Sequence, residues 1–449
     1  MAKPSHDVRR AWTMTVLLMV AMALTFWDKA VLGLAAVPIM KELHLSNSMY
    51  GLASSSFYLL FTVAAILVGL LVDKVRSKWV FVALALLWAV AQGSLLATST
   101  VTALFVSRIM IGAAEGPANP LTVHTVHSWF PVDKRSLPTS LTQIASGIGA
   151  LTSAPILTWI ITEFGWRWGF FTTAVLSALW ALVYAVFGKD RPAEAPAPTP
   201  SVTEEGAKEP AGESVPYRHI LLSRTFIGAV TMAFAASWSL AVVTSWLVPF
   251  FVNVAGFGSS AAGNMIIPPN VLGIVAILAI GAFAGRLMNR GIPDRVPLGI
   301  ITGAVVAVGG AFAVLVPHLG TGTLLVCGVT LAAGLPLVAM TSAYNAVGRI
   351  CPAGRRGAVL GTLNGLYSLG SIAGPYAMGL ILDASADEAS GYATGFTVTG
   401  LIVIAGGLCA AFLINPRRDR GRLAASPTTR TARAEQRGIA PRPLGQSGA

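Results

Sequence analysis

The sequence predicts an all-α membrane protein with twelve transmembrane helices, arranged as two pseudo-symmetric six-helix bundles with both termini in the cytoplasm. Three observations support this prediction: the composition, the number of long apolar stretches, and the side of the membrane on which basic residues fall. Of the 449 residues, 54% are hydrophobic and only 11% are charged, whereas a soluble globular protein has about 25% charged residues. The chain is therefore expected to lie in a bilayer.

Twelve apolar stretches are each long enough to span a membrane as a helix. They run approximately over residues 11–39, 48–72, 79–98, 102–126, 138–162, 167–187, 225–253, 261–285, 297–317, 322–346, 357–382 and 392–414. The first stretch follows Arg9 and Arg10, as the apolar part of a signal peptide would. Its length, its internal charges and the segments behind it indicate a retained helix instead.

Basic residues are distributed unevenly between the two faces of this predicted bundle. All but four of the 31 Lys and Arg residues fall in segments on the same side as the N-terminus. Lys41 and Arg167 lie on the other side, and Lys29 and Arg108 lie within the membrane. Short cytoplasmic loops retain positive charge, so both termini are expected in the cytoplasm and the chain in the cell membrane. The net charge of +12 then reflects topology, and no nucleic-acid partner is expected.

Composition also predicts the domain boundaries. Residues 188–224 contain DRPAEAPAPTPSVTEEGAKEPAGE, which buries too little apolar surface to fold and is expected to be a disordered cytoplasmic linker. This linker separates an N-terminal six-helix bundle, residues 1–187, from a C-terminal one, residues 225–414. The basic segment 415–449 is expected to be a disordered cytoplasmic tail, solvated or lying on the lipid surface.

The two halves contain a weak internal repeat. Gly69–Lys78 reads GLLVDKVRSK and Gly281–Arg290 reads GAFAGRLMNR, at equivalent places after the second helix of each half. The glycine, an apolar residue two positions on and the final base recur, while Gly285 replaces Asp73. Repeated six-helix units are typical of secondary transporters, in which the substrate site lies between the repeats.

Charge within the membrane is confined to two places. Arg108 and Glu115 lie seven residues apart in the fourth apolar stretch, and Asp28 and Lys29 lie late in the first. Seven residues are nearly two helical turns, so Arg108 and Glu115 should share a face roughly 10 Å apart along the axis. Intramembrane charges are costly and usually face a bundle interior or a water-filled path. These four residues are therefore the candidates for function.

The four charges suggest a coupling mechanism by themselves. With all of them ionised the group is neutral, and a proton on Asp28 or Glu115 would leave a positive charge that a carboxylate substrate could balance. Burial favours the protonated carboxyl while Arg108 and Lys29 favour the ionised one, so a proton could bind and leave near neutral pH. The alternative is a static ion-pair network that holds the first and fourth helices together.

Several motifs carry a resemblance to a known family. GLLVDKVRSK resembles the loop signature of the major facilitator superfamily, with Arg76 in place of its second glycine. RIMIGAAEGPANP (residues 108–120), the following Trp-Phe-Pro and the segments GWRW and SWLVPFF are similar to the anion:cation symporter family. The resemblance implies the major facilitator fold, with proton-coupled uptake of small organic anions such as sugar acids.

The same resemblance implies roles for individual residues. Arg108 matches a helix 4 arginine that contacts the substrate carboxylate, and Glu115 matches a proton-carrying glutamate. Asp28 and Lys29 match an acid–base pair of the first helix that is commonly Asp-Arg. Lysine lacks the planar fork that grips a carboxylate. Lys29 is therefore expected either to contact substrate or to neutralise Asp28 or Glu115, and we favour neutralisation.

Two further groups of polar residues are weaker candidates. Asp73, Lys74, Arg76 and Lys78 are expected at the cytoplasmic mouth, either as a conformational latch between the halves or as ordinary positive-inside charge. Gln143 and Asn364 are amides within apolar stretches, where they could contact substrate or form interhelical hydrogen bonds.

The sequence thus predicts a proton-coupled symporter of a small organic anion that works by alternating access as a monomer, with substrate, protons and lipid as its partners. No phosphate loop, metal cluster or nucleophile constellation is found in it, so we expect neither an enzyme nor a cofactor beyond the proton gradient. The main alternative is a proton-antiporting drug or metabolite exporter of the same fold. Antiporters of that fold tend to carry Gly-Pro in the fifth helix, where this chain has Ala154-Pro155. A third hypothesis is a membrane sensor that transports nothing.

Overall fold

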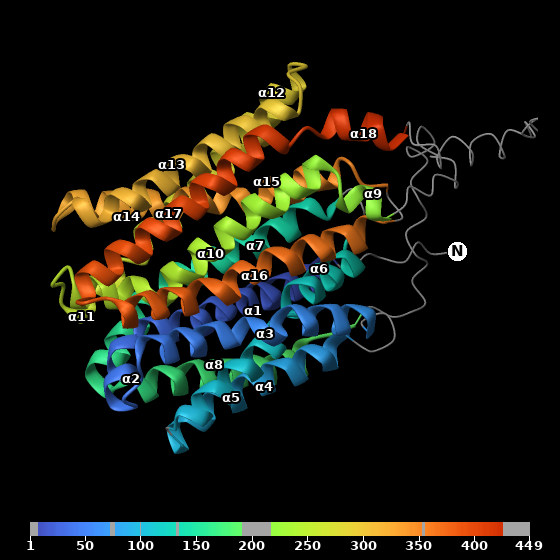
Figure 1. The fold of residues 1–449 in the computed structure, drawn as a ribbon. Helices are drawn as coiled ribbons and strands as arrows, with labels where there is room; N and C mark the ends of the chain where they lie inside the picture. The colour runs from blue at the N-terminus through green and yellow to red at the C-terminus, as the bar shows by residue number, and fades with distance from the viewer. Residues whose placement is uncertain are drawn as a thin grey trace, which may run out of the picture.

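The helices of this chain pack side by side and run along one common direction, as Figure 1 shows. The structure is a computed structural model that describes residues 8–71, 77–98, 100–131, 134–190, 217–352 and 355–424. Within these ranges the elements are helices joined by turns, and none is a β-strand. The all-α class is therefore confirmed.

The helices fall on either side of residues 191–216, which lie outside the described ranges. The N-terminal half, residues 8–190, contains α1 (Val8–Leu34), α2 (Ala36–Glu42), α3 (Asn47–Leu71), α4 (Ser77–Ala97), α5 (Val101–Glu115), α6 (Ala118–Trp129), α7 (Ser136–Phe164) and α8 (Trp166–Phe187). The C-terminal half, residues 217–424, contains α9 (Tyr217–Leu221), α10 (Arg224–Asn253), α11 (Ser259–Asn264), α12 (Ile267–Asn289), α13 (Thr302–Leu315), α14 (Thr323–Gly334), α15 (Val338–Gly348), α16 (Arg356–Ala384), α17 (Glu388–Leu413) and α18 (Pro416–Ala424). A π-helical segment, Val296–Ile301, precedes α13, and short 3₁₀ turns, Val316–His318 and Leu335–Leu337, follow α13 and α14.

Eleven helical segments of the described residues are long and apolar enough to cross a membrane. The expected fourth span is instead divided into α5 and α6, with Gly116 and Pro117 between them. A proline ring removes one backbone donor and clashes with the carbonyl four residues earlier, which breaks a helix. The prediction of one continuous helix over residues 102–126 is therefore wrong, and Glu115 becomes the last residue of α5. The count of twelve crossing segments stays a prediction.

Glycines set the distance between α3 and α5. A Cβ atom added to Gly112 would lie far inside van der Waals contact with the carbonyl oxygen of Phe57, and one added to Gly116 would do the same at Phe61. Both pairs are spaced by four residues, so one face of α5 touches the α3 backbone over a full turn. Small residues at such positions let membrane helices approach closely. This contact brings the aromatic rings of α3 up to the charged face of α5.

The two halves meet closely at the end of the bundle where α2 and α11 lie (Figure 1), called here the α2–α11 end. Asp383 at the end of α16 accepts hydrogen bonds from the backbone N–H groups of Asn47 (3.0 Å) and Ser48 (2.8 Å), at the start of α3. The Tyr50 hydroxyl lies 3.1 Å from the Ser245 carbonyl of α10. A cluster of buried apolar side chains also draws on both halves. The halves are therefore packed shut against each other at this end.

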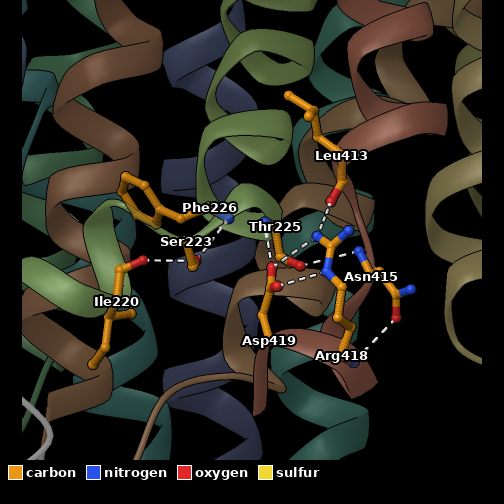
Figure 2. Close-up of polar contacts among 8 residues, drawn as sticks. All are labelled: Ile220, Ser223, Thr225, Phe226, Leu413, Asn415, Arg418 and Asp419. Carbon is orange, nitrogen blue, oxygen red and sulfur yellow. Dashed lines mark hydrogen bonds and ion pairs between the residues drawn. The ribbon is translucent and has the colours of Figure 1, made fainter. Parts of the chain in front are cut away.

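The start of the predicted tail is folded, as Figure 2 shows. Asp419 of α18 is 3% exposed and accepts a 2.8 Å hydrogen bond from the Thr225 amide in the first turn of α10. Arg418 pairs with Asp419 at 2.8 Å and donates to the Leu413 carbonyl at the end of α17. The amides of a helix N-terminus lack intrahelical partners and attract a carboxylate. Burial opposes ionisation of Asp419, but the hydrogen bonds from Arg418 and Thr225 outweigh it and lower the pKa of this carboxyl.

Two boundary predictions are corrected by these helices. The sequence predicts a disordered segment from 415, yet Pro416–Ala424 is helical and its one acid holds it against the start of α10; residues 425–449 lie outside the described ranges. Within the predicted linker 188–224, Tyr217–Leu221 forms the short helix α9. The division into two six-helix bundles stays a prediction.

We expect Gly112→Ala to lower the melting temperature of the purified protein, because the added methyl group meets a backbone carbonyl that cannot rotate away. Overpacking of this kind costs about 1–3 kcal/mol. Gly93→Ala on α4 is the matched control, since its new Cβ would lie 3.7 Å from the Ala174 Cβ, an ordinary contact. Equal melting temperatures for the two variants would contradict the close α3–α5 packing.

Candidate functional site

The charged residues of α1 and α5 come together in the interior of the N-terminal half. Lys29 Nζ lies 2.9 Å from Glu115 Oε2, and the Glu115 side chain is fully buried while that of Lys29 is 23% exposed. The ammonium group is also surrounded by rings, at 5.2 Å from the centroid of Phe26, 5.8 Å from Phe57 and 5.7 Å from Phe61. Cation–π attraction at such distances stabilises a desolvated cation. Lys29 is therefore compensated by one carboxylate and three aromatic faces.

Arg108 lies on the same face of α5, two turns before Glu115. It is 3% exposed, and its Cζ lies 4.9 Å from the centroid of the Phe57 ring. Its Nη1 donates a long 3.4 Å hydrogen bond to the backbone carbonyl of Asp28, and its Nε has no hydrogen-bond partner. Within the described part of the chain, no carboxylate oxygen lies within salt-bridge distance of this guanidinium. Its donors are therefore largely unused.

Asp28 points away from its neighbour Lys29, because successive helix residues are turned by about 100°. It is fully buried. Its Oδ1 accepts a 2.6 Å hydrogen bond from Gln92 Nε2 on α4, and the Gln92 carbonyl oxygen is in turn bonded to the Thr173 hydroxyl on α8. Asp28 Oδ2 has no hydrogen-bond partner. Lys29 thus pairs with Glu115 while Asp28 is held by an amide, and the role of Lys29 toward substrate stays a prediction.

The four groups form one electrostatic unit. Asp28 and Glu115 are neighbours, and both lie near Lys29 and Arg108. With every group ionised the unit carries no net charge, so a proton gained by either carboxyl leaves one positive charge uncompensated. The charges of the unit therefore balance only while both carboxyls are ionised.

The two predicted amides lie outside this unit. Gln143 of α7 donates a 3.0 Å hydrogen bond to Asn119 Oδ1 of α6. Asn364 of α16 accepts a 3.3 Å hydrogen bond from the Tyr344 hydroxyl, which also lies 3.3 Å from the hydroxyl of Tyr367. Each amide thus has an interhelical partner within its own half, and contact with substrate stays a prediction.

Of the four residues predicted to form a gate, the structure describes Lys78. Asp73, Lys74 and Arg76 lie outside the described residues. Lys78 lies in the first turn of α4, where its backbone amide donates to Asp190 Oδ1 at 2.9 Å and its ammonium lies 5.2 Å from the ring centroid of Trp79. The latch between the halves stays a prediction.

Three residues of the cluster are not among those predicted from the sequence. Gln92 and Thr173 hold Asp28, and the Phe57 ring lies near both Lys29 and Arg108. Gln92 was detectable, because it is an amide within the otherwise apolar stretch 79–98. Thr173 and Phe57 carry no such signal, since Thr and Phe are common in membrane helices and only tertiary contacts single these two out.

Comparison with known proteins identifies the family. The family model described as Major Facilitator Superfamily matches residues 18–342, and the chain belongs to that superfamily. It is therefore a multi-pass membrane transport protein and not an enzyme, as predicted. The resemblance to the anion:cation symporter family is consistent with the relatives described next.

Three relatives align along most of the chain. The probable sulfoacetate transporter SauU of Cupriavidus necator is 26% identical over 405 residues, covering 88% of this chain and 91% of that protein. The hexuronate transporter of Bacillus subtilis is 25% identical, with coverages of 87% and 90%. The probable L-galactonate transporter of Escherichia coli is 24% identical, with coverages of 92% and 93%.

Solved structures share the fold at low sequence identity. A bacterial homologue of the human lysosomal transporter Spinster, in an inward-facing and occupied conformation, superposes with a TM-score of 0.75 at 15% identity, covering 95% of this chain and 100% of that one. The D-xylose–proton symporter superposes with a TM-score of 0.74 at 16% identity, with coverages of 91% and 99%. The predicted fold is confirmed, whereas the side on which the termini lie stays a prediction.

We expect Lys29→Gln to destabilise the protein in the absence of substrate, because it strands the buried Glu115 carboxylate. Breaking a buried pair by removing one partner costs about 3 kcal/mol or more, and the double variant Lys29→Gln/Glu115→Gln should recover most of that loss. Thermal unfolding of the three proteins measures the coupling. Arg167→Gln is the contrast, because its partner Glu42 is 45% exposed and such pairs contribute about 1 kcal/mol or less. Additive losses in the double variant would contradict the Lys29–Glu115 pair.

Proposed function

We propose that this protein is a proton-coupled symporter that takes up a small organic anion by alternating access. The observation that carries the proposal is the buried Arg108 guanidinium, which has no carboxylate partner in the described part of the chain and lies beside two buried carboxyls. A static ion-pair network would be expected to pair each base with an acid. Here Glu115 is paired with Lys29, Asp28 is held by Gln92, and Arg108 is left with a carbonyl and a ring.

The anion is proposed to bind at Arg108. A planar guanidinium offers parallel donors that match a carboxylate or a sulfonate group, and desolvation strengthens such bonds. The relatives are, by their names, transporters of a hexuronate, a galactonate and sulfoacetate. These substrates share a small size and a fixed negative charge. We infer the same chemical class for this chain, with sugar acids as the first candidates.

The proton is proposed to bind at Glu115 or Asp28. Because the four charges balance when ionised, proton binding makes the site cationic and anion binding makes it neutral again. Each event favours the other, which is the linkage that symport requires. Glu115 is well placed to carry the change, since it ends α5 at the Gly116–Pro117 break and pairs with the partly exposed Lys29.

The closed α2–α11 end suggests which state of the cycle is seen. If the termini are cytoplasmic, as the distribution of Lys and Arg predicts, this end faces outward and the conformation is inward-facing. The contact of Asp383 with the first amides of α3 must then break when the protein opens outward. We further propose that Gln143 and Asn364 contact the polar part of the substrate and that Asp73, Lys74, Arg76 and Lys78 hold the opposite end shut in the other state.

Thermal-shift measurements against sulfoacetate, galacturonate and galactonate, with galactose as the uncharged comparison, test the anion site. We expect at least one acid to stabilise the wild-type protein and Arg108→Ala to lose that stabilisation. Arg108→Lys should weaken binding about tenfold or more, because the charge remains but the fork is lost. Arg295→Ala, which removes an exposed arginine in another part of the chain, is the control. An unchanged shift in Arg108→Ala would contradict the proposed site.

Proteoliposome flux tests the coupling. Glu115→Gln should bind and exchange the acid yet fail to accumulate it under an inward pH gradient, because proton release at that position is blocked. Wild-type vesicles are expected to concentrate the same acid and to lose this ability when a protonophore is added. If Glu115→Gln concentrates the acid as well as wild type does, Glu115 is not the coupling residue.

A further inference from the structure

A buried chain of three polar side chains joins α1, α4 and α8 beside the charged unit. Asp28, Gln92 and Thr173 are each fully buried. Gln92 lies between the other two, with one side of its amide at Asp28 Oδ1 and the other at the Thr173 hydroxyl. None of these contacts involves Arg108, Lys29 or Glu115. The chain therefore holds one carboxyl oxygen of Asp28 through side chains that carry no charge.

The Thr173 hydroxyl has two acceptors but only one proton. It can donate to the Phe170 carbonyl at 2.8 Å, within its own helix, or to the Gln92 carbonyl oxygen. If it donates to Gln92, the amide nitrogen of Gln92 faces Asp28 and donates to an ionised carboxylate. If the Thr173 hydroxyl donates its proton to Phe170, its oxygen can only accept a hydrogen bond from Gln92. The Gln92 amide nitrogen must then face Thr173 and donate to it.

The second arrangement requires a different protonation state of Asp28. A half-turn of the Gln92 amide exchanges its oxygen and nitrogen with almost no change in shape. The amide oxygen then faces Asp28 Oδ1, and two acceptors can be joined only if Asp28 carries a proton on that oxygen. The separation of 2.6 Å is usual for an O–H···O bond and shorter than most N–H···O bonds. Both arrangements leave every member of the chain bonded.

We propose that Gln92 is an amide switch that turns over with the protonation of Asp28, with Thr173 as the hydroxyl that reverses its donor role. In the ionised state protons point from Thr173 through Gln92 toward Asp28, and in the neutral state they point from Asp28 through Gln92 toward Thr173 and Phe170. One proton binds to Asp28 Oδ1. No other covalent bond forms or breaks, and the remaining changes are rotations of the Gln92 amide and the Thr173 hydroxyl. Gln92 and Thr173 are positioning residues, and the inference deepens the proposed symport by naming what accommodates the proton.

The surroundings of Asp28 support this assignment. The charged groups that act on it are Glu115 and Arg108 from α5 and Lys29 from α1. The helices α4 and α8 present Gln92 and Thr173, neither of which titrates. A buried carboxyl that takes up a proton on the oxygen facing a fixed donor would set that donor against the new O–H group, and the penalty is one polar group left without an acceptor. An amide that can turn removes that penalty in both states.

Infrared difference spectroscopy of the purified protein between pH 5 and pH 9, without substrate, tests the switch. In wild type we expect a protonated-carboxyl band at low pH that is absent in Asp28→Asn. We also expect a shift of a glutamine amide carbonyl band, identified by ¹³C-labelled glutamine, that is absent in Gln92→Met. In Gln92→Met the carboxyl band of Asp28 should persist to a pH about one unit higher or more, because the carboxylate has lost its donor.

Thr173 provides the matched comparison. Thr173→Ser keeps the hydroxyl and should retain the amide shift, whereas Thr173→Val should lose it. Thr172→Val is the control, because that hydroxyl donates to the Trp168 carbonyl and is not part of the chain. If Gln92→Met does not fold, the labelled wild type and Thr173→Val still decide the question. A carboxyl band that titrates in wild type without any glutamine shift would overturn the switch. Because no substrate or flux is involved, that result is distinct from a failure of the proposed symport.

Discussion

A charge within the hydrocarbon layer must be compensated by the protein itself, because neither water nor counterions are at hand. The charged residues of α1 and α5 meet this requirement in different ways. Lys29 has a carboxylate and three rings, and Asp28 has an amide. Arg108 has a carbonyl and one ring. This unequal compensation distinguishes the cluster from an ion-pair network in which each base is paired with an acid. The Arg108 guanidinium is the group whose N–H donors are least used.

The backbone packing of α3 against α5 is what makes such compensation possible. Gly112 and Gly116 allow the two helices to touch along a turn, so that Phe57 can lie against Arg108 and, with Phe61, against Lys29. Larger residues at the glycines would move the rings away from the cations. The break at Pro117 acts on the same helix and ends it at Glu115. Packing and charge therefore depend on each other in this half of the molecule.

The two halves differ in what they bring to the site. The N-terminal half supplies every charged residue of the cluster, while the C-terminal half supplies the groups that close the α2–α11 end, such as Asp383 on the first amides of α3. The folded start of the tail caps α10 and contacts the end of α17, both of which belong to the C-terminal half. The charged pairs of the C-terminal half, such as Arg349–Asp294 and Arg418–Asp419, lie apart from this cluster.

Hydropathy and charge placement alone were enough to predict the membrane class, most of the apolar helices and the identity of the four charged residues, because these depend on local composition and on the cost of charge in lipid. Helical periodicity likewise predicts that Arg108 and Glu115 share a face. Tertiary structure decided the rest. It paired Lys29 with Glu115 across two helices, folded Pro416–Ala424 onto α10, and brought Gln92, Thr173 and Phe57 to the cluster. Those partners come from helices far apart in the chain, and nothing in the local pattern of a segment specifies which neighbour its side chains will meet.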